Sequence, residues 1–163
     1  MKSRDKLILK IFIILSLIGL AVSTYQTVEH YFMSSSICDL SVSFSCSVVT
    51  ESAYGEFPQN SGIAVSFYGM VWWVAMLFIS FKMLNGWKLK DIEFYLFVWV
   101  IVGLGSILYF IFIELVVLPS ETGSLVICPF CTLQHLMILG IVPLSYLLLK
   151  KSFRTYLGDI FYK

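Results

Sequence analysis

The sequence contains few charged residues, and neither sign is in clear excess. Asp, Glu, Lys and Arg make up 13% of its 163 residues, against ~25% in soluble domains, and the formal net charge is +1. The near-neutral net charge argues against nucleic-acid binding as the main function. With 59% hydrophobic residues the chain is neither disordered nor fibrous. The composition therefore indicates an integral membrane protein with a single domain, residues 1–163.

Long apolar runs occupy most of the chain, and four of them reach the roughly 20 residues with which a helix crosses a bilayer. They cover about residues 7–28, 63–81, 94–118 and 127–149. Each run is too long and too continuously apolar for a strand of a membrane barrel, so we expect helices. The sequence predicts an all-α membrane protein, a four-transmembrane-helix bundle with a long outer loop (33–62) between helices 1 and 2.

Basic residues are absent from two connecting segments, 33–62 and 119–126. All 11 Lys and Arg residues lie at the start of the first run, between the second and third runs, or after the fourth. This one-sided distribution places both termini in the cytoplasm and the two lysine-free segments outside. A cleaved signal peptide over residues 1–23 is the alternative, and it would leave three spans. The length of the first apolar run favours a retained helix.

All four cysteines fall in the outer segments or at their membrane edge, on the side where thiol–disulfide chemistry persists. Cys128 and Cys131 form a Cys-Pro-Phe-Cys motif that opens the fourth run, and Pro129 suits the first position of a helix. Two thiols one turn apart lie on roughly the same face. A helix N-terminus favours a thiolate, whereas apolar burial opposes it. The motif predicts a redox-active pair with one exposed sulfur and one sulfur facing the bundle.

Cys38 and Cys46 lie eight residues apart in the outer loop. An extended chain would separate their Cα atoms by ~26 Å and a helix by ~12 Å, whereas a disulfide needs roughly 4.4–6.8 Å. Either the segment folds back on itself, or these cysteines exchange partners with other sulfurs. A purely structural set of disulfides and a four-cysteine zinc site are two further alternatives. A helix bundle needs no disulfide staple, and the cysteine spacing is poor for zinc, so we expect no metal.

Several short motifs accompany the cysteines in a fixed order. These are Cys38-Asp39, Cys46-Ser47, Ser52-Ala53-Tyr54-Gly55, Gly62, Ser66-Phe67-Tyr68-Gly69, Gly105-Ser106, Tyr109 and Cys128–Cys131. In order, spacing and membrane placement, the chain resembles the vitamin K epoxide reductase family over nearly its whole length. Another family of quinone-linked four-helix thiol oxidases carries its Cys-x-x-Cys motif early in the chain, and it fits less well.

The resemblance implies a bundle around a quinone of the menaquinone, ubiquinone or phylloquinone type, capped by the outer loop. It also implies roles for the cysteines. Cys131 would face the quinone, and Cys128 would pair with Cys131 and exchange with Cys46. Cys38 and Cys46 would take electrons from a separate thioredoxin-like protein on the outer side.

The resemblance further suggests polar contacts for the quinone. Ser52 matches a serine or threonine position linked with the quinone site, and Tyr54 belongs to the same motif. Asn60 is a loose match to an asparagine that mammalian members carry before the second span. His135 stands one turn after Cys131, where those members have a tyrosine. A histidine there can donate to a quinone oxygen and move protons near neutral pH, and packing between helices is its alternative role.

For other polar residues at the outer ends of the spans we expect structural or interfacial roles rather than contacts with a quinone. We expect Glu114, near the end of the third span, to reach interfacial water, and we assign Glu29 and His30 a similar interfacial role. Asp39 is expected to order the outer loop or to tune Cys38.

These observations predict a membrane thiol–disulfide oxidoreductase that passes electrons from a thioredoxin-like partner through paired cysteines to a quinone and supports disulfide formation. A vitamin K epoxide and quinone reductase is the alternative within the same chemistry. A non-catalytic bundle with structural disulfides is the alternative of another class. The last five residues contain no lysine pair of the kind that returns proteins to the reticulum, which favours a prokaryotic plasma membrane.

Overall fold

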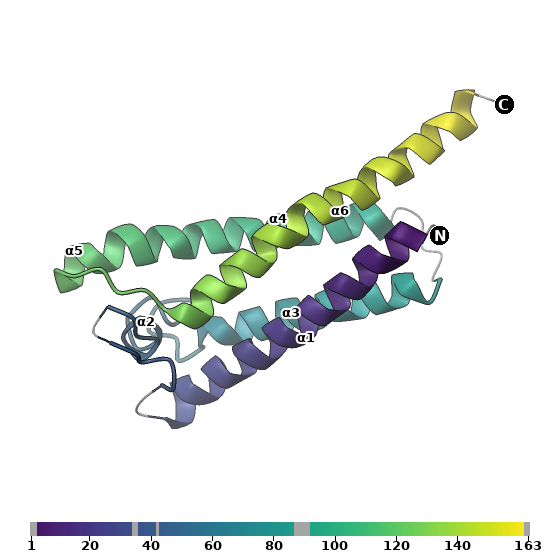
Figure 1. Cartoon of the computed structure of the whole chain (residues 1–163). Coiled ribbons are helices and arrows are strands. Elements are labelled where there is room, and N and C mark those ends of the chain that lie inside the picture. The colour runs from purple at the N-terminus through teal and green to yellow at the C-terminus, as the bar shows by residue number, and fades with distance from the viewer. Residues whose placement is uncertain (1–2, 34–35, 42, 87–91, 162–163) are drawn as a thin grey trace.

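The computed structural model describes residues 3–33, 36–41, 43–86 and 92–161. Four long helices run side by side along the molecule (Figure 1): α1 (Ser3–Phe32), α3 (Val65–Leu84), α4 (Ile92–Phe112) and α6 (Pro129–Phe161). Three short elements lie at one end of these helices: α2 (Ser47–Thr50), a π-helical turn η1 (Ile113–Val117) and α5 (Leu118–Thr122). The first turn of α1 and the last turns of α6 lie toward the opposite end (Figure 1).

Four helical segments are long and apolar enough to cross a membrane, which confirms the expected all-α membrane bundle. They are Ser3–Phe32, Val65–Leu84, Ile92–Glu121 and Pro129–Lys150. The fourth helix begins at Pro129 rather than at residue 127. Proline suits the first helical position, so Cys128 remains outside the helix. Lys2, Lys88, Lys90 and Lys163, on which the predicted orientation partly depends, lie outside the described residues.

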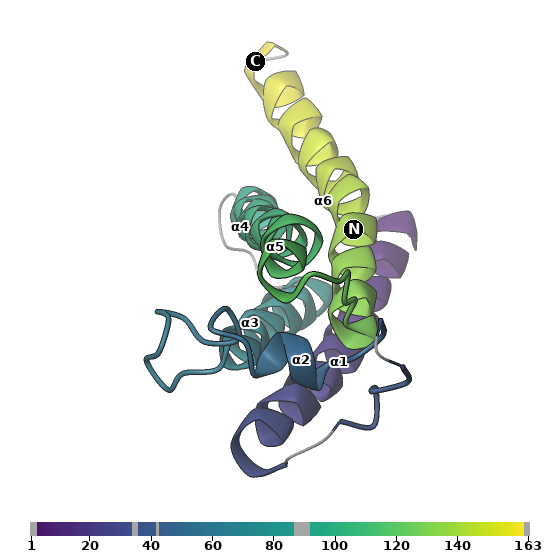
Figure 2. The same ribbon diagram turned by 90° about the vertical axis from the view of Figure 1, so that its left-hand side faces the viewer.

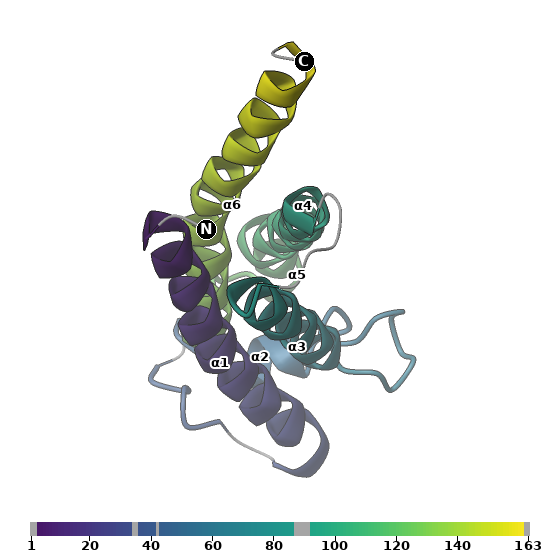
Figure 3. The same ribbon diagram turned by 90° about the vertical axis from the view of Figure 1, so that its right-hand side faces the viewer.

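The helices pack as two pairs, α1 along α3 and α4 along α6, and the pairs enclose a common apolar core. Views toward the two ends show these four helices around one interior (Figures 2 and 3). Phe12, Trp73, Leu96 and Ile141 are among the side chains that are fully buried there. Many large apolar side chains on the outside, such as Phe78, are exposed, as is expected of a surface that faces lipid.

Gly19 lets α1 approach α3 closely. A Cβ atom at this position would overlap the indole ring of Trp73, which is 1% exposed. Gly140 on α6 has no atom within 4 Å of the place where its Cβ would lie. The absence of a side chain at Gly19 is therefore a packing requirement, whereas the absence at Gly140 is not.

The outer loop folds back on itself and is attached to the chain just before α6. The backbone N–H of Phe44 donates to Ser41 O at 3.0 Å, which closes a tight turn between the two loop cysteines. The Ser45 N–H donates to Ile127 O at 3.2 Å, and the Ile127 N–H donates to Ser43 O at 2.9 Å. This short pairing carries the loop to the residue next to Cys128.

Asp39 holds the turn of the loop together, as expected. Its Oδ1 accepts hydrogen bonds from Ser45 Oγ (2.7 Å), Cys46 N (2.8 Å) and Ser47 N (3.1 Å). Its Oδ2 accepts from Ser47 Oγ (2.6 Å) and Ser36 N (3.0 Å). Burial by itself would raise the pKa of Asp39, but these hydrogen bonds outweigh it and hold the pKa well below its ordinary value.

We predict that Asp39→Asn loosens the loop, because an amide cannot accept all these bonds and adds two donors. In the parent the stabilisation is present above about pH 4 and is lost as the pH falls toward the lowered pKa. Hydrogen exchange of peptide 36–50 should show protection at least about ten-fold lower in the variant at pH 7. Glu51→Gln, at an exposed carboxylate of the same loop, is the control. Equal protection in Asp39→Asn and the parent would contradict this role.

We also predict that Gly19→Ala lowers the stability of the bundle, by about 1–3 kcal/mol, because the added methyl group overpacks the contact with Trp73. The midpoint of thermal unfolding in detergent measures the effect. Gly140→Ala is the matched control and should leave the midpoint nearly unchanged. Equal midpoints for the two variants would show that the α1–α3 contact is not tight.

Candidate functional site

Three sulfur atoms meet where the outer loop touches the start of α6. Cys38 and Cys46 form a disulfide with a Cα–Cα distance of 5.7 Å. Of the two alternatives that the sequence left open, the loop therefore takes the one in which it folds back on itself. Cys128 and Cys131 are free thiols. The Sγ atoms of Cys128 and Cys46 are 3.1 Å apart, and both residues are fully buried. A thiol in contact with a disulfide is close enough for thiol–disulfide exchange.

This cluster does not resemble a zinc site. The Sγ atoms of Cys38, Cys46 and Cys128 lie within 4.8 Å of one another. Two of these three sulfurs are already joined to each other, which leaves one thiol, whereas a structural zinc ion needs four ligands. The arrangement fits sulfur exchange better than metal binding.

Cys128 and Cys131 are positioned by the N-terminus of α6, as the Cys-Pro-Phe-Cys motif predicts. Pro129 is the first helical residue, so Cys128 lies just outside the helix and Cys131 lies in its first turn. The backbone N–H of Cys131 donates to Cys128 Sγ at 3.2 Å. Cys128 is fully buried against the loop disulfide, and Cys131 is half-buried and lines the cavity. The prediction that one sulfur of the pair is exposed is therefore wrong, because the outer loop covers Cys128.

The expectation that Glu114 reaches interfacial water is wrong. Glu114 is 6% exposed, and its Oε1 accepts a hydrogen bond from the backbone N–H of Cys128. The residue lies in the π-helical turn η1, which changes the register of α4 and turns the carboxylate inward. An N–H group before the first turn of α6 has no partner within the helix, so this contact satisfies it.

The interfacial role assigned to Glu29 and His30 is also wrong. Glu29 is 2% exposed. His30 contacts the outer loop, with Nδ1 at 3.1 Å from Thr50 O and Nε2 at 3.4 Å from Glu56 Oε1. The end of α1 is covered by the loop, so these side chains face protein rather than water.

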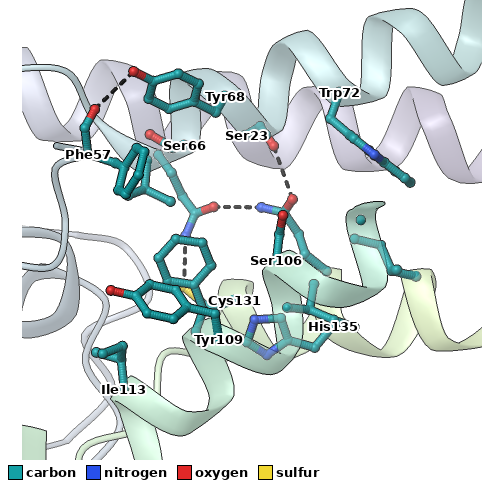
Figure 4. Close-up of a pocket in the computed structure, with 18 of the residues that line it drawn as sticks. Ser23, Phe57, Ser66, Tyr68, Trp72, Ser106, Tyr109, Ile113, Cys131 and His135 are labelled. Carbon is teal, nitrogen blue, oxygen red and sulfur yellow. Dashed lines mark hydrogen bonds between the residues drawn. The ribbon is translucent and has the colours of Figure 1, made fainter. Parts of the chain in front are cut away.

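A cavity of about 890 Å³ lies between the helices, and Cys131 forms part of its lining. Cys131, His135 and Tyr109 point into the same space between α6 and α4 (Figure 4), and Glu114 also lines it. Trp72 and Trp99 form part of the wall, with nearly parallel rings at an interplanar angle of 9°. The cavity is large enough for a cofactor of drug size and is mostly apolar with a few polar groups.

The structure brings two of the four predicted quinone contacts to this cavity and not the other two. His135 and Tyr54 line the cavity. The Tyr54 hydroxyl donates to Glu121 Oε1 at 3.0 Å, and this bond raises the pKa of the phenol, which keeps it a donor. Ser52 does not line the cavity and donates to Val49 O at 2.8 Å. Asn60 is exposed in the outer loop and does not line the cavity.

Two glutamines that the sequence analysis did not single out also line the cavity. Gln26 Nε2 lies 3.4 Å from Cys131 Sγ and 3.6 Å from Cys128 Sγ. Gln134 Nε2 donates to Gln26 Oε1 at 2.7 Å. The signal that could have found them is the presence of an uncharged polar group inside an apolar span, which is costly unless it is bonded.

Comparison with known proteins agrees with this geometry. The model of the vitamin K epoxide reductase family matches residues 10–146, which include the four cysteines, both glutamines and the residues that line the cavity. No match is found among the curated proteins. Because the family model covers most of the chain and all of the site, this protein belongs to the vitamin K epoxide reductase family.

Proposed function

We propose that this membrane redox enzyme is a quinone-dependent thiol oxidoreductase. It passes electrons from a separate thioredoxin-like protein on the outer side, through the loop and helix cysteines, to a quinone in the cavity. Its physiological role is to support disulfide formation. The observation that carries the proposal is the 3.1 Å contact between Cys46 and Cys128, with Cys131 of the same motif lining the cavity.

The exchange between the two cysteine pairs balances without any other reactant. A Cys46 thiolate attacks Cys128 of a Cys128–Cys131 disulfide, and Cys131 leaves as a thiolate. Cys38 then attacks Cys46, and Cys128 leaves in turn. Two electrons and two protons move from the loop to the helix pair. The observed arrangement, with a loop disulfide and two free helix thiols, is the product of this transfer.

The cavity fits a quinone on three counts: its volume, its apolar wall and its few polar groups beside Cys131. A quinone held there would supply an acceptor for the two electrons and two protons that the helix pair gives up on closing its disulfide. His135 Nε2 or Nδ1 and the Glu114 carboxyl line the cavity beside that sulfur, where each is able to hold a proton. Tyr54 offers a hydroxyl at the loop side. Ser52 and Asn60 would need the loop to rearrange before they reached the cavity.

The contact between a free thiol and a disulfide also argues against a purely structural role for the cysteines. A structural disulfide is best kept away from free thiols, because thiol attack would reshuffle it. Here Cys128 lies against the loop disulfide in a buried position. The non-catalytic bundle is therefore the weaker interpretation.

We further propose that both termini face the cytoplasm, in a prokaryotic plasma membrane. The first turn of α1 and the last turns of α6 lie toward one end of the bundle, and α2 of the outer loop and the start of α6 lie at the other (Figure 1). The cysteines belong to that loop and to the start of α6. Arg4, Lys6 and Lys10 lie at the terminal end of α1. The positive-inside rule then puts the cysteines on the outer side, where a thioredoxin-like protein can reach them.

We predict that Cys131→Ala abolishes quinone-dependent oxidation of a dithiol such as dithiothreitol, with at least a ~100-fold loss of turnover, because the helix pair can no longer form its disulfide. Quinone binding should persist. Trp72 and Trp99 in the cavity wall provide the readout, as quenching of tryptophan fluorescence by added quinone. Turnover that survived the substitution would rule out the proposed route. Turnover lost together with binding would leave the role of this sulfur unsupported, and the proposal would fail there too.

A further inference from the structure

The helix cysteines share a hydrogen-bond donor that belongs to neither their own helix nor the outer loop. Gln26 lies on α1, is 3% exposed, and places its amide nitrogen 3.4 Å from Cys131 Sγ and 3.6 Å from Cys128 Sγ. An NH₂ group carries two hydrogens, one for each sulfur. The amide is thus positioned to act on both members of the pair.

The direction of this amide is fixed by residues farther along a chain of hydrogen bonds. Trp73 Nε1 lies 2.9 Å from Gln134 Oε1, and the Ser23 hydroxyl lies 3.1 Å from the same oxygen. An indole N–H can only donate, so this end of the Gln134 amide must be the oxygen. Its NH₂ group then faces Gln26 Oε1 at 2.7 Å, and the NH₂ group of Gln26 must face the sulfurs.

This chain of hydrogen bonds is anchored by buried side chains and ends at the cavity. Trp73 and Ser23 are fully buried, and Figure 4 shows the bonds leading from Ser23 to Cys131. A Cβ atom on Gly69 would lie 3.1 Å from Ser23 Oγ and 3.9 Å from Gln134 Oε1. The missing side chain of this glycine on α3 therefore leaves room for the chain of hydrogen bonds. The donors therefore cannot easily turn away when the charge on the sulfurs changes.

Fixed N–H donors favour the forms of the helix pair that carry negative charge. A thiolate is a strong acceptor, whereas a disulfide sulfur is a weak one, so the amide stabilises the reduced pair more than the oxidised pair. In the exchange described above, Cys131 leaves as a thiolate, and a stabilised leaving group departs faster. The same amide thus favours electron transfer from the loop to the helix.

We propose that Gln26, held in one orientation by Gln134, is a positioning residue that stabilises the reduced state of Cys128 and Cys131 and draws electrons from the outer loop to the cavity. The proposal rests on the proposed function only in taking these cysteines as the route of the electrons. The step that it affects is an internal equilibrium: loop dithiol plus helix disulfide gives loop disulfide plus helix dithiol. Two electrons and two protons are exchanged, and no outside reactant is needed.

The test is the position of that equilibrium. Fully reduced protein in detergent receives one equivalent of a two-electron oxidant, equilibrates and is quenched in acid. Differential alkylation and peptide mass spectrometry then give the ratio of loop disulfide to helix disulfide. The parent should hold mainly the loop disulfide. Gln26→Leu, which keeps the side-chain size, should shift the ratio toward the helix disulfide by about ten-fold or more.

A double-mutant cycle separates this role from simple packing. Gln134→Leu should shift the ratio in the same direction but less, because Gln26 then loses its orientation and keeps its donors. The double variant should be no more shifted than Gln26→Leu alone, since Gln134 acts through Gln26. Thr24→Val is the control on α1, because Thr24 is exposed and bonds to Leu20 and Met70 instead.

An unchanged ratio in Gln26→Leu, or strictly additive shifts in the double variant, would overturn the proposal. A second measurement guards against misfolding: the alkylation rate of Cys131 as a function of pH. The variant should react more slowly than the parent near neutral pH and match it at high pH, where the thiol ionises without help. A rate difference that persists at high pH would indicate altered access and would also overturn it. Neither readout uses a quinone, so failure here leaves the Cys131→Ala test of the proposed function standing.

Discussion

The contact between Cys46 and Cys128 is the interaction on which the rest of the site depends. These sulfurs come from positions 82 residues apart in the chain, and the 3.1 Å between them joins the outer loop to the start of α6. Each side is held independently. Asp39 and the short backbone pairing to Ile127 fix the loop, and Glu114 and Pro129 fix the start of α6. Loss of either support would open a gap that thiol–disulfide exchange cannot cross.

The bundle gives this contact a buried, directional environment. Polar side chains inside an apolar membrane protein are costly unless they are hydrogen-bonded. Here they form a chain of hydrogen bonds that runs from Trp73 through the two glutamines to the cysteine sulfurs. Gly19 and Gly69 allow the helices that carry these groups to approach closely. The same packing that stabilises the bundle therefore orients the donors at the cysteine pair, where Cys131 lines the cavity.

The helices and the cysteines could be predicted from the sequence because their signals are local. Length and hydropathy define a span, and a proline after Cys128 defines a helix start. The inward faces of the spans could not be predicted, because the helices are apolar on nearly all sides and no amphipathic stripe marks the interior. For this reason the roles of Gln26 and Gln134 were missed. Glu114 was misjudged because a π-helical turn changes its register, and the sequence carries no clear mark of such a turn. Whether Ser52 and Asn60 reach the cavity depends on the path of a long loop, which spacing alone does not determine.

The most direct test of this account is to trap the sulfur exchange at its midpoint. Cys38→Ser removes the sulfur that completes the transfer, so Cys46 should remain joined to Cys128 after mild oxidation. Peptide mass spectrometry of the non-reduced protein identifies that bond, and Cys38→Ser combined with Cys128→Ser should lack it. The exchange route predicts the Cys46–Cys128 disulfide as the main product. A variant that forms only the Cys128–Cys131 disulfide and leaves Cys46 as a free thiol would contradict it.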